Sequence, residues 1–222
     1  MRRGSITLLC ATLDVAYSAA ALTRPLPMPS SHDFASATAW DAAYNAAGCP
    51  AAEWLVEFAP IRSLLLEQLG PVREQPILEL GCGTSSLAAR LCIDESFASV
   101  TACDASRVAV EASSRRFANV PGLQFVREDA RRLSFDAGSF GAIIDKGTLD
   151  AICSGEGYDY EGGRVASELQ RVLRPGGRWL CISLMPPSVV LPMMQRREWG
   201  NTLVRLCGIE SHHVYAAVRQ QE

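Results

Sequence analysis

The stretch that decides the fold is Glu79-Leu80-Gly81-Cys82-Gly83-Thr84, which follows the apolar residues Ile77 and Leu78. Two glycines directly after a short apolar run predict a strand that turns sharply into a helix, here at Thr84–Leu91. Glycine is favoured where a ligand must approach the backbone closely, because a Cβ atom would obstruct it. The stretch therefore predicts a nucleotide-binding loop, although two glycines alone are also typical of a simple tight turn.

Outward from this loop, short apolar runs alternate with amphipathic ones, such as Ser106–Phe117 and Arg164–Leu173. This alternation predicts an α/β fold in which helices cross over both faces of a parallel sheet. Only a short turn separates the last two apolar runs, which excludes a helical crossover and favours an antiparallel hairpin. We therefore expect a doubly wound, mostly parallel seven-stranded sheet with an antiparallel C-terminal hairpin, its strands at Ile77–Leu80, Ser99–Cys103, Leu123–Val126, Phe140–Ile144, Arg178–Leu184, Thr202–Leu206 and His213–Val218.

The chain before the first strand divides near residue 36. Residues 1–36 begin with two arginines, continue through an alanine-rich apolar run and end in Pro- and Ser-rich sequence. That composition is typical of a targeting segment or of a disordered N-terminal extension. Residues 37–222 are the expected folded domain, and it opens with helical apolar spacing at Ala37–Ala47 and Glu53–Leu69.

Acidic residues follow the two strands after the glycine loop. Asp104 ends the second expected strand, where a carboxylate can accept hydrogen bonds from ribose hydroxyls, and Asp129-Ala130 follows the third. Each acid alone is more often a solvated loop residue or a helix cap. Because neighbouring parallel strands end at the same edge of a sheet, the glycine loop, Asp104 and Asp129-Ala130 together predict one binding site.

The glycine loop favours S-adenosylmethionine over a dinucleotide. A dinucleotide loop carries a third glycine where this chain has Ser86. Glu79 would also repel a pyrophosphate, whereas its carboxylate suits a cofactor that carries an ammonium and a sulfonium. The sequence therefore predicts S-adenosylmethionine as the cofactor and disfavours a dehydrogenase.

These motifs resemble a known family. Glu79–Gly83 is similar to the first motif of class I S-adenosylmethionine-dependent methyltransferases, and Leu173–Gly177 resembles the turn before their fifth strand. The most specific string, Asp145-Lys146-Gly147-Thr148-Leu149-Asp150-Ala151, resembles the eukaryotic methyltransferase-like family that includes elongation factor 1-alpha lysine methyltransferases. The resemblance runs from the Trp40–Tyr44 motif to about Val218. It implies a Rossmann-like class I methyltransferase domain, a protein-lysine methyltransferase activity and a protein substrate, with a translation elongation factor as the candidate.

The resemblance also implies which residues bind the cofactor. Two stretches, Ala51–Trp54 and the glycine-rich Cys153–Gly163, depart from the family pattern and would shape the substrate entrance. Taken from the methionine end of the cofactor to its adenine, the implied residues are Trp40, Tyr44 and Trp54 in the N-terminal segments, Glu79, Gly81 and Gly83 in the loop, Asp104 and Ala105 at the ribose, Asp129 and Ala130 at the adenine, and Lys146 closing the pocket.

Asp145 and Lys146 are the predicted catalytic pair. Lys146 is the only lysine of the chain, and a compact ammonium on a flexible stem is expected where an arginine would not fit, although one lysine also occurs by chance. A lysine substrate must lose a proton before it attacks the methyl group, and Asp145 is the candidate acceptor. The alternatives are that Asp145 caps the loop or orients Lys146.

Composition narrows the classes of partner. The 222 residues carry a net charge of −3 and hold no long apolar run, so we expect no nucleic-acid or membrane partner. The eight cysteines include no C-x-x-C pair, so we expect reduced thiols and no metal. We expect a cytoplasmic monomer, with organellar import through residues 1–36 as the alternative. A small-molecule methyltransferase and a non-catalytic cofactor-binding partner protein remain alternative functions.

Overall fold

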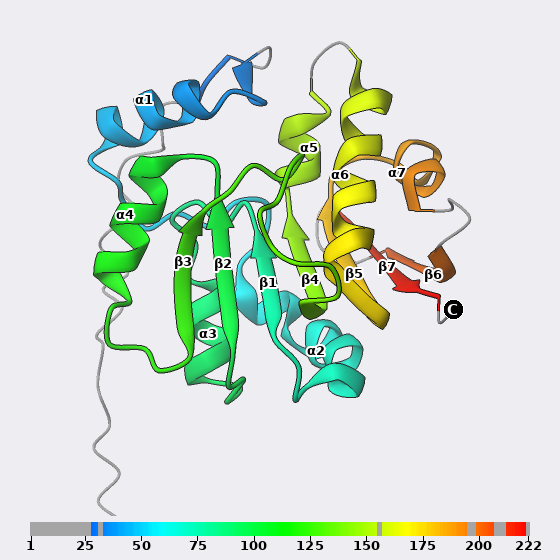
Figure 1. Ribbon diagram of the computed structural model, residues 1–222. Helices are drawn as coiled ribbons and strands as arrows, with labels where there is room; N and C mark the ends of the chain where they lie inside the picture. The colour runs from blue at the N-terminus through cyan, green and yellow to red at the C-terminus, as the bar shows by residue number, and fades with distance from the viewer. Residues whose placement is uncertain (1–27, 31–32, 155–156, 195–198, 207–211, 221–222) are drawn as a thin grey trace, which may run out of the picture.

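The computed structural model describes residues 28–30, 33–154, 157–194, 199–206 and 212–220 (Figure 1). Its strands are β1 (Ile77–Leu80), β2 (Val100–Asp104), β3 (Leu123–Arg127), β4 (Phe140–Lys146), β5 (Leu173–Ser183), β6 (Trp199–Leu206) and β7 (His213–Arg219). They form one sheet in the order β3-β2-β1-β4-β5-β7-β6. The first five strands in this order, β3-β2-β1-β4-β5, pair in parallel, whereas β7 is antiparallel to both β5 and β6. The predicted mostly parallel sheet with an antiparallel C-terminal hairpin is confirmed.

The helices of the described residues cover both faces of the sheet. They are α1 (Ala37–Ala47), α2 (Phe58–Leu69), the 3₁₀ turn η3 (Gly70–Val72), α3 (Leu87–Ile93), α4 (Arg107–Arg116), α5 (Thr148–Ile152), α6 (Tyr158–Val172) and α7 (Pro187–Met194). Figure 1 shows α6 in front of the sheet and α3 behind it. Within this described part of the chain, no helix has both the length and the apolar character that crossing a bilayer requires.

β1 lies between two hydrophobic cores, because successive strand side chains point to opposite faces of a sheet. Leu78 and Leu80 pack into the core that includes residues of α6 and α7. Ile77 packs into the other core, with residues of α2 and α3. All four residues of β1 are buried, as expected for a central strand that helices cover on both faces.

Some helices differ from their predicted bounds. α2 begins at Phe58 instead of Glu53, because the Glu53 side chain is bound to other parts of the molecule, as described below. α7 was not predicted from the sequence, and it contains Pro192, a residue that argues against a helix. α6 begins at Tyr158 instead of Arg164, within the glycine-rich stretch Cys153–Gly163, whose composition is typical of a loop. A Cβ on Gly162 would lie 2.6 Å from Met193 Sδ, so this glycine lets α6 pack closely on α7.

The functional edge of the sheet is the one where the parallel strands end. β1 has β2 on one side and β4 on the other, so the chain connections diverge at this point and leave a crevice beside the loop after β1. Figure 1 shows α1 lying across this edge. The fold thus brings the loops after β1, β2, β3 and β4 together beneath α1.

Candidate active site

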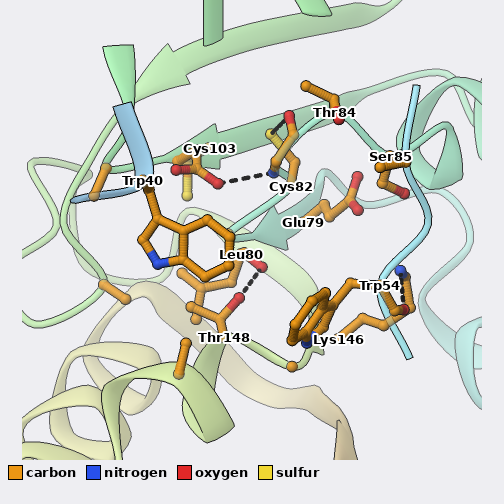
Figure 2. Close-up of a pocket in the computed structure, with 18 of the residues that line it drawn as sticks. Trp40, Trp54, Glu79, Leu80, Cys82, Thr84, Ser85, Cys103, Lys146 and Thr148 are labelled. Carbon is orange, nitrogen blue, oxygen red and sulfur yellow. Dashed lines mark hydrogen bonds between the residues drawn. The ribbon is translucent and has the colours of Figure 1, made fainter. Parts of the chain in front are cut away.

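A cavity of about 450 Å³ lies at this edge of the sheet. Its walls come from α1, from the residues that join α1 to α2, from the loops after β1, β2 and β3, and from the start of α5. Figure 2 shows Trp40, Trp54, Glu79 and Lys146 gathered around this space. The structure places all the residues expected at the cofactor in the lining of this single cavity: Trp40, Tyr44, Trp54, Glu79, Gly81, Gly83, Asp104, Ala105, Asp129, Ala130 and Lys146.

The two glycines of the loop have left-handed backbone conformations, with φ of +61° at Gly81 and +52° at Gly83. A Cβ on Gly81 would collide with the side chain of Thr148, and one on Gly83 would lie 2.6 Å from Tyr44 Oη. The sequence explains these glycines by the close approach of a ligand. The structure adds that each glycine lets another wall of the cavity pack directly on the loop.

Asp104 ties the glycine loop to the end of β2. Its Oδ2 accepts a hydrogen bond from Gly83 N and its Oδ1 accepts one from Ser106 N, both at 2.8 Å. Burial raises the pKa of this carboxyl, and the two backbone N–H donors oppose that shift. Asp104 therefore fixes the shape of the loop as well as lining the cavity, and its role toward a ribose remains a prediction.

Asp129 lines the cavity but already has a partner. Its carboxylate accepts hydrogen bonds from Arg131 Nε at 2.9 Å and from Arg131 Nη2 at 2.8 Å. Partial burial opposes ionisation of Asp129, yet these bonds hold its pKa below the ordinary value. The neighbouring Ala130 is buried. Contact of Asp129 and Ala130 with an adenine remains a prediction, and the carboxylate would share its acceptor sites with Arg131.

Glu79 is the most deeply buried acid of the cavity wall. Its Oε2 accepts a hydrogen bond from Ala88 N at 3.0 Å. Burial raises the pKa of this carboxyl to about 8; Lys146 opposes the shift and Glu53 adds to it. Without a cationic ligand, Glu79 therefore holds a proton at neutral pH. A cation beside it would favour the ionised form.

Lys146 is held in place from the opposite wall. Its Nζ donates to Trp54 O at 2.8 Å and forms an ion pair with Glu53 Oε2 at 3.2 Å, and only 4% of its side chain is exposed. Lys146 therefore lies beside the cavity, where it was expected. Two donors of the ammonium group are nevertheless engaged by the protein itself.

Glu53 lies in the Ala51–Trp54 stretch that was expected at the substrate entrance, but it was not predicted as a cofactor-site residue. Its Oε1 accepts from Ser86 N and Ser86 Oγ, and its Oε2 accepts from Ser85 Oγ as well as from Lys146. Burial opposes ionisation, but Lys146 and the serine donors hold the pKa of Glu53 below its ordinary value. Helical apolar spacing predicted a helix from Glu53, and the departure of Ala51–Trp54 from the family pattern does not indicate which groups the carboxylate of Glu53 binds.

Asp145 does not line the cavity. It is fully buried, and its Oδ1 accepts from Thr148 N at 2.9 Å and from Leu149 N at 3.2 Å, so it caps the short helix α5. Burial raises its pKa to about 7, and Asp150 adds to the shift. The expected role as proton acceptor thus has no support in this geometry. The capping alternative describes what the carboxylate does.

The rest of the Asp145–Ala151 string also serves to shape the wall. Gly147 has φ +84°, and a Cβ there would collide with Trp54. Thr148 Oγ1 donates to Leu80 O at 2.7 Å and thereby joins α5 to the end of β1. Asp150 Oδ1 accepts from Leu184 N at 2.8 Å and anchors the residues after β5.

Aromatic rings form the wall above the glycine loop. Trp40 lies 5.8 Å from Tyr44 and 6.0 Å from Trp54 between ring centroids, the latter pair edge to face. Phe34 stacks on Trp40 at 5.9 Å, and its carbonyl accepts from Trp40 Nε1 at 2.7 Å. Phe34 falls within the expected N-terminal extension and was not predicted at the site. The wall of the cavity therefore begins before residue 37.

The ionisable side chains of the cavity wall are mainly acidic. Lys146 is the only basic side chain among the described residues that line it, and the acidic ones are Glu53, Glu79, Asp104, Glu128 and Asp129. Such a wall suits a cationic ligand and disfavours a pyrophosphate. The part of the chain that the structure describes contains no group of three or more side chains that could hold a metal ion.

Comparison with known proteins adds to this geometry. Residues 78–181 match the family described as Methyltransferase domain. The chain is 41% identical over 157 residues to EEF1A lysine methyltransferase 4 of Mus musculus, covering 67% of this chain and 60% of that protein. It is 32% identical over 180 residues to the eEF1A lysine and N-terminal methyltransferase of Xenopus laevis, covering 80% of this chain and 26% of that protein.

A solved structure shares the fold. Phosphoethanolamine N-methyltransferase 2 of Haemonchus contortus, in complex with phosphomonomethylethanolamine and S-adenosylhomocysteine, superposes with a TM-score of 0.61 at 15% identity. The match covers 87% of this chain and 61% of that one. At this identity the likeness concerns the fold alone. The chain also spans less than two thirds of the length of the EEF1A lysine methyltransferases, at 60% of the mouse protein.

Proposed function

The chain carries a class I methyltransferase domain related to that of the EEF1A lysine methyltransferases, and from this premise we propose that it methylates a lysine side chain of a protein. S-adenosylmethionine is the cofactor of this domain. The observation that carries the proposal is the lining of the cavity, where an acidic wall and the glycine loop meet beneath three aromatic rings. This wall suits a cofactor with an ammonium and a sulfonium and would repel the pyrophosphate of a dinucleotide.

The chain's own residues contribute positioning and the exclusion of water. S-adenosylmethionine supplies an activated methyl group that an amine can displace in line. Because charge moves without a new charge forming, most of the rate must come from orientation of the amine and from a dry site. Trp40 and Trp54 cover the cavity with apolar surface. Since Asp145 lies outside the lining, we propose that the amine loses its proton to the solvent before it enters the dry site.

The proposed substrate is a translation elongation factor. The mouse and Xenopus relatives are named for methylation of eEF1A, and the match to the mouse protein covers 67% of this chain. We therefore propose elongation factor 1-alpha as the first substrate to test.

The test is transfer of a labelled methyl group. The purified chain is incubated with methyl-labelled S-adenosylmethionine and unmodified recombinant elongation factor 1-alpha, and in parallel with a cell lysate. Mass spectrometry should locate the label on a lysine of a protein. Label found only on metabolites would support the small-molecule alternative. Binding of S-adenosylhomocysteine without transfer to either fraction would support the non-catalytic alternative, and each of these two results would refute the proposal.

We also propose that the protein works as a cytoplasmic monomer without a nucleic-acid or membrane partner. The net charge of −3 supports only the absence of a nucleic-acid or membrane partner, because it provides no attraction to nucleic acid or to an anionic surface. Residues 1–27 lie outside the described residues, so the alternative of a targeting segment stays a prediction. Microscopy of the full chain beside a variant that lacks residues 1–27 tests the location. Light scattering tests the oligomeric state.

A further inference from the structure

The segment of residues 49–57, which joins α1 to α2, forms one wall of the cavity without any helix or strand of its own. Outside the flanking helices, its backbone–backbone hydrogen bonds run from Cys49 N to Tyr44 O and from Val56 N to Trp54 O. Cys49 and Leu55 have φ of +52° and +63°, in the left-handed region that non-glycine residues rarely adopt. Such conformations persist only where the surroundings impose them. The shape of this wall must therefore be set by contacts from outside the segment.

Arg116 Nη2 donates to Cys49 O and Val56 is buried in a hydrophobic core, so both ends of the segment are held separately. Glu53 supplies the contacts of its middle part. Its two carboxylate oxygens accept four hydrogen bonds: three come from Ser85 and Ser86, directly after the glycine loop, and one comes from Lys146 at the end of β4. Lys146 also donates to Trp54 O. A single side chain thus joins the segment to the two loops that lie under the cavity.

Trp54, the next residue, depends on this attachment. Its ring lies against Gly147, where a Cβ would not fit, and edge to face with Trp40 at 6.0 Å. The side chain of Glu53 anchors the residue before Trp54, and Lys146 holds the carbonyl oxygen of Trp54 itself. Arg116 still holds Cys49 O and Val56 is buried, so loss of the attachment would free the middle of the segment, which carries the indole of Trp54.

We infer that Glu53 is a positioning residue that holds Trp54 and the segment 49–57 against the bound cofactor, and that Lys146 serves the same task. This inference rests on the proposed function for the identity of the cofactor. It changes the role of Lys146 from a group that acts on the substrate to a group that holds one wall of the site. It also explains why the chain has a lysine here, because an ammonium on a narrow stem can reach a carboxylate and a carbonyl within a buried space.

The inference predicts that Glu53 and Lys146 are coupled. Removing one of them leaves the other buried without its partner, and removing the second then adds little. If loss of the pair lowers the closed fraction of the segment to about one tenth, the dissociation constant for the cofactor rises about tenfold.

The test is a double-mutant cycle of Glu53→Gln and Lys146→Met, measured by calorimetric titration with S-adenosylhomocysteine well below the melting temperature. We expect each single variant to bind about tenfold more weakly, and the double variant to bind no more than about twofold more weakly than the poorer single one. Hydrogen exchange should increase within residues 49–57 in all three. Glu168→Gln is the matched control, because Glu168 also accepts from a backbone N–H and an arginine but lies outside the cavity lining. It should change neither measurement.

Two results would overturn the inference: an unchanged affinity and exchange in Glu53→Gln, or losses of affinity that simply multiply in the double variant. Neither measurement requires methyl transfer. If the cycle behaves as expected but no protein lysine is labelled, the proposed function fails while the positioning role stands. If a lysine is labelled but the cycle is additive, the positioning role fails alone.

Discussion

Glu79→Gln tests the electrostatics of the cavity wall. The carboxyl group of Glu79 has its pKa raised to about 8 by burial, against an ordinary value of 4.5. Because the pKa is raised in the folded state, the stability that the proton provides is fully present below about pH 4.5 and is lost as the pH rises through 8. The groups that act on Glu79 are Lys146, which lowers the pKa, and Glu53 and Asp104, which raise it.

The expected size of the effect follows from the two pKa values. Between pH 6 and pH 8 the ionisation of Glu79 should cost the ligand-free wild type about 2 kcal/mol of unfolding free energy, at roughly 1.4 kcal/mol per pKa unit. For a chain of this length that corresponds to a fall in melting temperature of about 4–8 °C. Glutamine keeps an acceptor for Ala88 N but cannot ionise, so Glu79→Gln should lack this part of the fall.

The assay is a set of thermal melts of both proteins from pH 5 to pH 9, with and without S-adenosylhomocysteine. The ammonium of the ligand should favour ionised Glu79, so wild-type affinity should rise with pH up to about 8, whereas Glu79→Gln should bind more weakly and with less dependence on pH. Glu168→Gln controls for the loss of one carboxylate outside the cavity. Equal pH dependence of melting in wild type and Glu79→Gln would refute the assignment of a protonated Glu79.

Four further results are expected. Asp104→Ala should weaken binding of S-adenosylhomocysteine by about 1–3 kcal/mol in calorimetry, because the N–H groups of Gly83 and Ser106 lose their acceptor, and unchanged affinity would contradict this role. Lys146→Arg should stay folded in circular dichroism but lose methyl transfer, since a planar guanidinium does not fit the buried space where the Lys146 side chain is only 4% exposed. Wild-type rates in this variant would show that the space does accept an arginine. Gly83→Ala should lower both the melting temperature and the affinity for S-adenosylhomocysteine. Adding Tyr44→Phe should restore part of the affinity, because it removes the hydroxyl group that lies 2.6 Å from the new Cβ. A double variant that binds no better than Gly83→Ala would exclude that contact. Saturation with S-adenosylhomocysteine at a hundred times its dissociation constant should raise the melting temperature by about 5–10 °C whereas NAD should not, and a shift with NAD alone would overturn the choice of cofactor.

The fold could be predicted because its signals are local. Apolar runs of strand length alternate with helical spacing, and the few residues before His213 exclude a crossover, so the mostly parallel pairing and the hairpin could be predicted from spacing. The order of the strands in the sheet was not predicted. α5 and the start of α6 could not be predicted in this way. α5 has only five residues, and its N-terminus is stabilised by the buried carboxylate of Asp145. Gly162 of α6 is explained by packing against Met193 of α7, a contact between residues that lie far apart in the chain.

The site shows the same division between local and distant causes. Gly81 and Asp104 could be found because a turn and a strand end are visible in the sequence. Glu53 could not, because its partners Ser86 and Lys146 lie 33 and 93 residues away in the chain. For Asp145 the sequence left two roles open, proton acceptor or cap, because only the fold determines that its carboxylate points to the backbone of α5.

The lining of the cavity comes entirely from the first two thirds of the chain. Among the described residues, those that line it run from Met28 to Ile152, and β5, β6, β7, α6 and α7 contribute none. During synthesis, every one of these lining groups is therefore made before the strand that must flank β4 on its outer side. The later elements support the sheet without touching the cavity. Substitutions within them should therefore lower the amount of folded protein in the cell, and should leave the cofactor affinity of the folded molecules largely unchanged.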